Sequence, residues 1–239
     1  MTKLNNLEDR YWKKLDKIVI FGFGRQGKKM YQTLKKDFDI VAIVDNSPEK
    51  QGKQMEGYTI LSFDQASSLL RQYKVIVTTS QYYYQAIRDQ LHSVGLNENI
   101  DYIMYQQFVT EWYYKYKNKV NVLKTDISLT TLCTLNCEHC MQFLPYWKDG
   151  RRKENAWEEI KENVDIYFEC VDYLLDLDVV GGEPFLYRNL NEFIRYIGEN
   201  YRNRIGYIGF ITNGMIVPKE ETLELLSKYS MDVSISDYS

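Results

Sequence analysis

Three of the four cysteines lie within eight residues, at Cys133, Cys137 and Cys140, with the spacing C-x3-C-x2-C. Residues 126–130 before them alternate polar and apolar side chains, which is typical of a half-buried strand. Residues 141–150 after them contain aromatic side chains, a proline and a glycine, and are predicted to form a loop. Thiolates bind zinc or iron, and three of them leave one coordination position open. The spacing therefore predicts a site for a soft metal or an iron–sulfur cluster.

Further polar groups follow, or belong to, the later strands that the sequence predicts. These strands are expected at residues 175–180, 207–211 and 231–236, with helices between them. The groups are Gly181, Gly182 and Glu183 after the first of these strands, Asn213 after the second, and Ser234 and Ser236 in the third. In a β/α barrel the carboxyl ends of the strands form the face that carries the active site. We therefore expect these groups to lie near the three cysteines.

The cysteine spacing after one strand, with Gly-Gly-Glu-Pro after the next, resembles the radical S-adenosylmethionine (radical SAM) superfamily over residues 124–239. The resemblance implies that Cys133, Cys137 and Cys140 ligate three irons of a 4Fe-4S cluster, whose fourth iron binds S-adenosylmethionine. The resemblance also implies that Glu183, with the backbone of Gly181 and Gly182, binds the methionine amino group. It implies that Ser234 or Ser236 contacts the ribose and that Asn213 lies on the same rim of the site.

The same resemblance implies the reaction. The reduced cluster would cleave S-adenosylmethionine and yield a 5′-deoxyadenosyl radical that abstracts hydrogen from the substrate. An electron donor such as flavodoxin or ferredoxin is the expected partner, and the substrate is expected to be a small molecule or a sugar. The family barrel usually has six β/α units, whereas about four strands are predicted here. We therefore expect a partial, truncated barrel and hypothesise that the sequence is a fragment of a longer enzyme.

The N-terminal half carries a second motif. An apolar strand at residues 17–21 runs into Gly22-x-Gly24-x-x-Gly27, a helix follows, and a second strand ends at Asp45. In a dinucleotide site these glycines serve the tight turn, the approach of a phosphate and the packing of helix on strand, and the acid accepts hydrogen bonds from ribose hydroxyls. Chain geometry alone also explains three glycines at these positions. Both interpretations stay open at this point.

Strands and helices alternate up to residue 104, which predicts a doubly wound parallel sheet. Residues 15–105 resemble the Rossmann-like N-terminal domain of bacterial sugar acyltransferases and capsule-related transferases, on the segments IVIFGFGRQGKKM, VAIVDNSPEKQG and KVIVTTSQYYYQAI. The resemblance implies a nucleotide or nucleotide sugar as ligand, or a structural role, with a link to carbohydrate or surface-polysaccharide metabolism, and the glycine motif adds NAD as a candidate ligand. In the alternative function, this half is an NAD-linked oxidoreductase or nucleotide-binding module, and the cysteines with His139 form a structural zinc site.

The predicted organisation is an N-terminal helix (1–16), a Rossmann-like domain (17–104), a connecting helix (105–123) and a partial radical SAM domain (124–239). The fold class is α/β throughout. A net charge of -3 does not indicate a nucleic-acid partner, and no apolar run approaches the ~20 residues that span a bilayer. Clustered cysteines without a secretory signal indicate a reducing, cytoplasmic location. The remaining cysteine, Cys170, is expected in the core of a helix.

Overall fold

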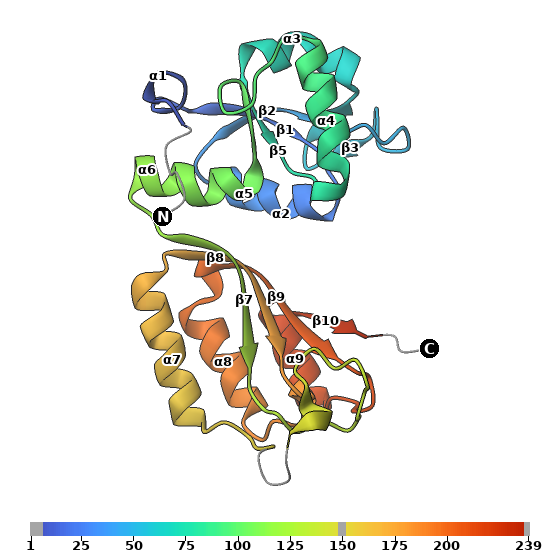
Figure 1. Ribbon diagram of the computed structural model, residues 1–239, viewed down its shortest axis with the longest axis vertical. Helices are drawn as coiled ribbons and strands as arrows, with labels where there is room; N and C mark the ends of the chain where they lie inside the picture. Colours follow the sequence, from blue (N-terminus) through green and yellow to red (C-terminus); the bar gives the residue numbers. More distant parts are fainter. Residues whose placement is uncertain (1–6, 148–151, 237–239) are drawn as a thin grey trace. The chain divides into compact units, whose positions relative to one another are not determined.

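The computed structural model describes residues 7–147 and 152–236. The chain divides into two compact units, residues 1–118 and 119–239, each built from alternating strands and helices (Figure 1). Each unit buries its own cluster of apolar side chains, so the two units are described separately.

The N-terminal unit contains a six-stranded sheet in the order β3-β4-β2-β1-β5-β6. Its strands are β1 (Lys17–Phe21), β2 (Asp39–Val44), β3 (Gln54–Met55), β4 (Tyr58–Leu61), β5 (Lys74–Val77) and β6 (Tyr102–Met104). The longer helices are α2 (Arg25–Leu34), α3 (Phe63–Gln72) and α4 (Gln81–Ser93). All strand pairs are parallel except the antiparallel pair β3 and β4. The order runs outward in both directions from β1, as in a doubly wound sheet.

The first strands of this unit are apolar because both faces of the sheet are covered. Val19, Phe21, Val44 and Val77 are fully buried in one cluster with side chains from the neighbouring helices. The start of α3 is fixed by a capping box, in which the Ser62 hydroxyl and the side chain that follows three residues later satisfy each other's backbone N–H groups. Because β1 pairs in parallel with both β2 and β5, the carboxyl ends of these three strands lie at one edge of the sheet.

The helix predicted over residues 1–16 is wrong in extent for the described residues, and residues 1–6 lie outside the description. Helix α1 covers only Asp9–Trp12. Trp12 is completely buried, and its indole N–H donates a hydrogen bond of 2.6 Å to the carbonyl of Asn99. A helix of four residues is not stable alone, so the burial of Trp12 and its hydrogen bond stabilise this segment.

The connecting helix is also shorter than predicted. It consists of α5 (Tyr105–Gln107), a π-helical turn η1 (Phe108–Trp112) and α6 (Tyr113–Lys117). The helix ends at Asn118, which adopts a left-handed conformation with φ 51°. Asparagine tolerates this conformation better than most residues, so it can terminate a helix without glycine. Residues 121–123 belong to the next strand.

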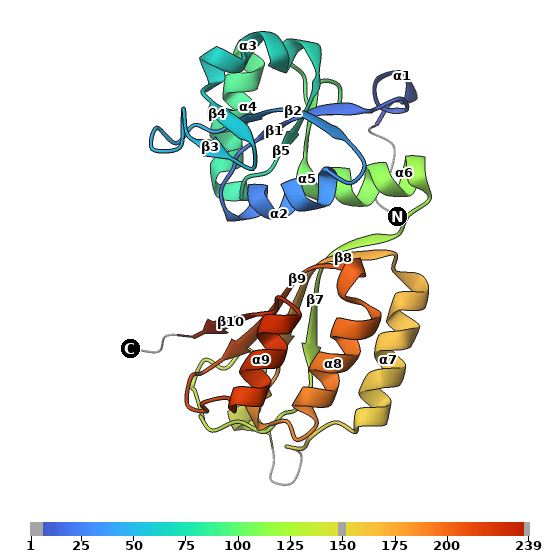
Figure 2. The ribbon, with the colours of Figure 1, turned by 180° about the vertical axis from the view of Figure 1, so that it is seen from behind.

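The C-terminal unit contains a four-stranded parallel sheet in the order β10-β9-β8-β7. Its strands are β7 (Asn121–Ser128), β8 (Tyr173–Val180), β9 (Ile205–Thr212) and β10 (Asp232–Ile235), and its helices are α7 (Trp157–Cys170), α8 (Leu190–Asn200) and α9 (Glu220–Lys228). The helices cover one face of the sheet (Figures 1 and 2). Neighbours in the sheet are also neighbours in sequence, as in the wall of a β/α barrel. The partial barrel itself stays a prediction.

The two faces of this sheet differ in chemistry. The helix-covered face buries apolar side chains such as Leu177, Ile208 and Phe210. The opposite face carries Lys124, whose ammonium lies 2.8 Å from the carboxylate of Asp178. Hydrogen bonding to Asp178 raises the pKa of Lys124 above its ordinary value. A polar face opposite the helices is suited to line a site.

Two smaller expectations about this unit are also settled. The strand predicted over residues 126–130 begins five residues earlier, at Asn121, and ends at Ser128. Cys170, expected in the core, is exposed. It lies at the C-terminal end of α7, two residues after Phe168, so it points away from the face that Phe168 buries. Within residues 7–147 and 152–236, every helix is too short or too polar to cross a bilayer.

Candidate functional site

The three clustered cysteines lie in the long loop between β7 and α7, and this loop is closed at its base. The N–H of Thr131 donates to the carbonyl of Lys153 at 2.9 Å, and the N–H of Asn155 donates to the carbonyl of Leu129 at 3.1 Å. Thr130 also forms an antiparallel bridge with the segment that leads into α7. The start and the end of the loop are thus held side by side.

Cys133, Cys137 and Cys140 are half-buried and line one cavity of about 500 Å³. The other residues of the cavity wall include the ends of β8 and β9 and the residue that follows β10, namely Gly181, Gly182, Thr212, Asn213 and Ser236, together with Lys124, Asp126 and Asp178 from the polar face of the sheet. The carboxyl ends of the parallel strands therefore bring the cysteine loop and these groups together.

The two glycines after β8 bring this strand end close to the cysteine loop. The N–H of Gly182 donates to Thr130 at 2.8 Å, and that of Glu183 donates to Leu132 at 2.7 Å. A Cβ on Gly182 would lie 1.9 Å from the carbonyl oxygen of Leu132, and one on Gly181 would lie 2.5 Å from that of Thr130. From the sequence, these glycines are expected to let backbone approach a ligand. In the structure, the space that a side chain would need is filled by the protein's own backbone.

Glu183 is completely buried and lies behind the cavity rather than in its lining. Its Oε1 accepts a hydrogen bond of 2.8 Å from the Thr212 hydroxyl and one of 3.1 Å from the N–H of Phe185. Its Oε2 accepts a bond of 2.9 Å from the N–H of Asn213. The carboxylate thus ties the end of β8 to the end of β9. The contact between Thr212 and Glu183 was not predicted from the sequence. The available signal was that Thr212 directly precedes Asn213, at the same strand end.

The remaining predicted residues of this unit differ in position. Ser236 lines the cavity, and its N–H donates to the carbonyl of Thr212 at 2.8 Å. Ser234 lies in β10 and does not belong to the lining. The side-chain amide of Asn213 reaches the cysteine loop, with its Nδ2 3.5 Å from the sulfur of Cys133 and 3.0 Å from the Thr134 hydroxyl.

The arrangement of the thiols can be compared with the needs of a cluster and of a single ion. Among the described residues, no three His, Cys, Asp or Glu side chains gather as the ligands of one metal ion do. In a 4Fe-4S cluster each thiolate binds a different iron, so cluster ligands surround a cavity instead of converging on a point. Three thiols of one loop around one cavity fit a cluster, and His139, the fourth ligand of the alternative zinc site, lines the same cavity.

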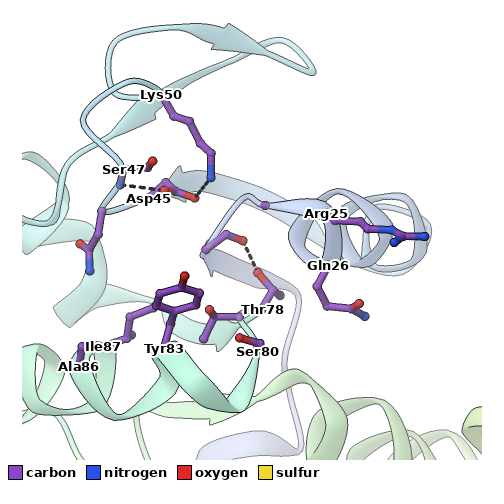
Figure 3. A pocket seen from close by; sticks show the side chains of 14 residues that line it. Arg25, Gln26, Asp45, Ser47, Lys50, Thr78, Ser80, Tyr83, Ala86 and Ile87 are labelled. Carbon is purple, nitrogen blue, oxygen red and sulfur yellow. Dashed lines mark hydrogen bonds and ion pairs between the residues drawn. The ribbon is translucent and has the colours of Figure 1, made fainter. Parts of the chain in front are cut away.

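The N-terminal unit has its own cavity, of about 720 Å³, at the carboxyl ends of β1, β2 and β5 (Figure 3). Gly22 and Gly24 line it, and Gly27 does not. Gly22 has a φ of 101°, and a Cβ on Gly27 would lie 2.0 Å from the carbonyl oxygen of Gly22. Chain geometry therefore requires glycine at these two positions. Gly24 differs, because nothing lies within 4 Å of the place where its Cβ would be.

Asp45 lines the same cavity but is bound within the protein. Its carboxylate accepts hydrogen bonds from the N–H of Phe23 at 2.5 Å and the N–H of Ser47 at 2.9 Å, and it lies 3.1 Å from the ammonium of Lys50 (Figure 3). From the sequence, this carboxylate is expected to accept hydrogen bonds from ribose hydroxyls. In the structure its partners are supplied by the chain, and sequence reasoning missed Lys50.

Two family models match the chain, one in each unit. Residues 127–236 match the radical SAM superfamily, and residues 14–100 match a family described as C2185-like, N-terminal. The resemblance of the N-terminal unit to sugar acyltransferase domains stays a prediction.

Curated relatives match about half of the chain. It is 28% identical over 113 residues to the antilisterial bacteriocin subtilosin biosynthesis protein AlbA of Bacillus subtilis, covering 47% of this chain and 23% of that protein. It is 30% identical over 122 residues to GTP 3′,8-cyclase of Alkaliphilus oremlandii, covering 50% of this chain and 36% of that protein. The chain thus spans a third or less of the length of most such relatives.

Among solved structures, Streptococcus suis SuiB bound to precursor peptide SuiA aligns with 72% of this chain and 36% of its own. The TM-score is 0.37 and the sequence identity is 16%, so this likeness is too weak to carry an argument.

Proposed function

We propose that the C-terminal unit, whose residues 127–236 match the radical SAM superfamily, is a radical SAM domain that holds a 4Fe-4S cluster on Cys133, Cys137 and Cys140 and binds S-adenosylmethionine beside it. The observation that supports this most is that these three thiols line one cavity together with the ends of three parallel strands. When bound, such a cluster supplies the electron that cleaves S-adenosylmethionine to a 5′-deoxyadenosyl radical, and a flavodoxin or ferredoxin would provide that electron.

The chain's own residues orient the cosubstrate. Gly181 and Gly182 present backbone to the cavity, and Ser236 adds a hydroxyl to the same wall. Asp178 and Asp126 contribute carboxylates from the polar face of the sheet, where both pair with the Lys124 ammonium, at 2.8 and 3.4 Å. Glu183 acts from behind the wall, since contact with the methionine amino group would require its carboxylate to leave three hydrogen-bond donors.

Anaerobic reconstitution with iron and sulfide tests this proposal. The wild-type chain should bind about four irons, develop the brown absorbance of a cluster, and form 5′-deoxyadenosine from S-adenosylmethionine with dithionite. Cys137→Ala should lose the iron, whereas Cys170→Ala should keep it, because Cys170 is exposed at the end of α7. Stoichiometric zinc in a colourless protein would instead support the structural zinc site.

The substrate of the radical is not fixed by the shared domain. One relative is a bacteriocin biosynthesis protein and the other is a GTP cyclase, so relatives with this domain differ in what they act on. A small molecule or a sugar remains the proposed class, and the test is whether deoxyadenosine formation rises when candidate substrates are added.

We further propose that the N-terminal unit binds a phosphorylated small molecule such as a nucleotide sugar or NAD. The observation that favours it is Gly24, because neither its φ of -79° nor packing requires glycine there. It is the N-cap of α2, where serine, aspartate or asparagine would cap the helix better. A ligand that approaches the backbone closely is a physical reason to have no side chain at this position.

The surroundings of Gly24 favour an anion. The first turn of α2 contains no acidic residue, and its free N–H groups attract negative charge. Gln26 lines the cavity, and within the described chain its buried Nε2 has no hydrogen-bond partner. Lys50 adds a cation to the lining. A phosphate beside Gly24 would satisfy the free N–H groups of α2 and the Gln26 amide, whereas Lys50 is already paired with Asp45.

Substitution at Gly24 separates binding from folding. Gly24→Asp and Gly24→Asn place similar side chains in open space and both cap a helix well, so both variants should fold as the wild type does. Calorimetry with UDP-glucose and with NAD should show that Gly24→Asp weakens binding at least about tenfold more than Gly24→Asn, since only the carboxylate repels phosphate. Absence of binding to the wild type would leave the unit a structural domain.

A further inference from the structure

We infer that Asn213 is a positioning residue that donates a hydrogen bond to the thiolate of Cys133 and thereby raises the reduction potential of the cluster. The inference rests on the proposed function, because it concerns the cluster that Cys133 would hold. It starts from two residues 80 positions apart in sequence, whose Nδ2 and Sγ atoms lie 3.5 Å apart.

The orientation of the Asn213 amide is fixed by its other contacts. Its Oδ1 accepts a hydrogen bond of 3.0 Å from the N–H of Met215, a group that can only donate. The amide nitrogen then faces Cys133, while the hydroxyl of Thr134 lies between the two amide atoms, 3.0 Å from Nδ2 and 3.4 Å from Oδ1. A reversed amide would set two N–H groups against each other and place an oxygen next to the thiolate, so the donor is directed at the sulfur.

The backbone of Asn213 is held as firmly as its side chain. Its N–H donates to the buried carboxylate of Glu183 at 2.9 Å, and this carboxylate also binds the hydroxyl of Thr212. The backbone of Glu183 in turn donates to Leu132, which directly precedes Cys133. Both ends of the N–H···S contact are therefore tied to Glu183, the Asn213 end through its carboxylate and the Cys133 end through its backbone N–H.

The three cysteines are not equivalent in this respect. Among the described residues, donors reach the sulfur of Cys133, from Asn213 and from the N–H of Leu135 at 3.4 Å, and do not reach those of Cys137 or Cys140. Reduction makes the cluster more negative, and a donor to a ligand sulfur stabilises the more negative state. The iron on Cys133 is thus the one whose electronic properties the chain adjusts directly.

The test is an EPR-monitored redox titration of reconstituted protein. Asn213→Asp keeps Oδ1 for Met215 and loses the donor, and Asn213→Ala loses it without adding charge. Both variants should keep the wild-type iron content and show a midpoint potential shifted to lower values. The matched control, Thr134→Val, removes the second partner of the amide and should leave the midpoint unchanged.

A spectroscopic readout covers the case in which one variant assembles poorly. Resonance Raman spectra of the wild type should show iron–thiolate bands that shift in D₂O, and the shift should decrease in whichever Asn213 variant holds a cluster. Equal midpoints and equal D₂O shifts in wild type and variants would overturn the inference, as would a shift in Thr134→Val as large as that in Asn213→Ala. A wild-type chain that binds no cluster would instead contradict the proposed function.

Discussion

The ammonium of Lys50 lies 3.1 Å from the carboxylate of Asp45, at the position where the sequence predicts a contact with ribose. The Asp45 side chain is 8% exposed and that of Lys50 is 29% exposed, so the pair is largely shielded from water. The acid that follows β2 therefore serves the fold, and its partner Lys50 carries a positive charge to the lining of the cavity. Because Phe23, Ser47 and Lys50 already occupy the Asp45 carboxylate, it is poorly placed to bind the hydroxyl groups of a ligand.

Lys50→Met should destabilise the N-terminal unit by about 1.5–3 kcal/mol, the usual contribution of a hydrogen bond to a charged group. The variant leaves the Asp45 carboxylate with two backbone donors and no cation. Urea unfolding monitored by circular dichroism measures the effect. Lys53→Met is the matched control, since Lys53 is exposed in the same segment. Equal stability of the two variants would show that the ion pair contributes nothing.

Glu183→Gln should lower the free energy of unfolding of the C-terminal unit by about 1–3 kcal/mol. Glutamine has one acceptor oxygen in place of two, and its NH₂ group would face either the N–H of Asn213 or the donors on the other side. Denaturant unfolding of the metal-free chain detects this loss without any cofactor. Glu199→Gln, on the exposed end of α8, should change stability little. A fully stable Glu183→Gln chain would argue against the buried role.

Gly182→Ala should be among the most damaging small substitutions in the chain, with a cost of about 3 kcal/mol. Its Cβ would lie 1.9 Å from the carbonyl oxygen of Leu132, so the start of the cysteine loop must move. Gly24→Ala, which adds the same methyl group to open space, should cost less than about 1 kcal/mol. Thermal unfolding of both variants is the measurement, and similar melting temperatures would contradict the close approach.

Asp165 predicts a pH dependence of the C-terminal unit. Hydrogen bonds from Tyr196, Tyr201 and Lys161 lower the pKa of Asp165 from 3.8 to about 2. Since the folded-state pKa lies below that of the unfolded chain, this contribution to stability is complete above about pH 4 and is lost as the pH falls toward 2. Unfolding measured from pH 5 to pH 2 should show the gap between the wild type and Asp165→Asn narrowing over this window. If the difference in free energy of unfolding between the wild type and Asp165→Asn stays constant over this range, Asp165 does not contribute to the loss of stability in acid.

Local sequence signals located many of the elements. An apolar run bounded by glycine predicts a strand over residues 17–21, and β1 covers these residues because such a run has few alternatives to a buried parallel strand. The strand ends that carry Cys133, Gly182 and Asn213 could be ordered from the alternation of strands and helices. The topological rule that parallel strands end at one edge then places them near each other.

The contacts of individual side chains could not be predicted in this way. Glu183 is read from its motif as a ligand-binding acid, yet its partners Thr212 and Asn213 are 29 and 30 residues away and become visible only in three dimensions. The same holds for Trp12, whose hydrogen bond to Asn99 spans 87 residues. Periodicity describes which face is buried, and it does not describe which distant group completes a hydrogen bond.

The hydrogen bonds that join residues 129–131 to residues 153–155 have a thermodynamic consequence for the cysteines. They make the intervening segment a closed loop before any iron arrives, so the three thiols have a high effective concentration relative to one another. The conformational entropy of bringing the three thiols together is lost when the sheet folds. It is therefore not lost a second time when the thiols bind a cluster. Cluster uptake should therefore follow the folding of the sheet, with the rate falling at the denaturant concentration that opens this loop.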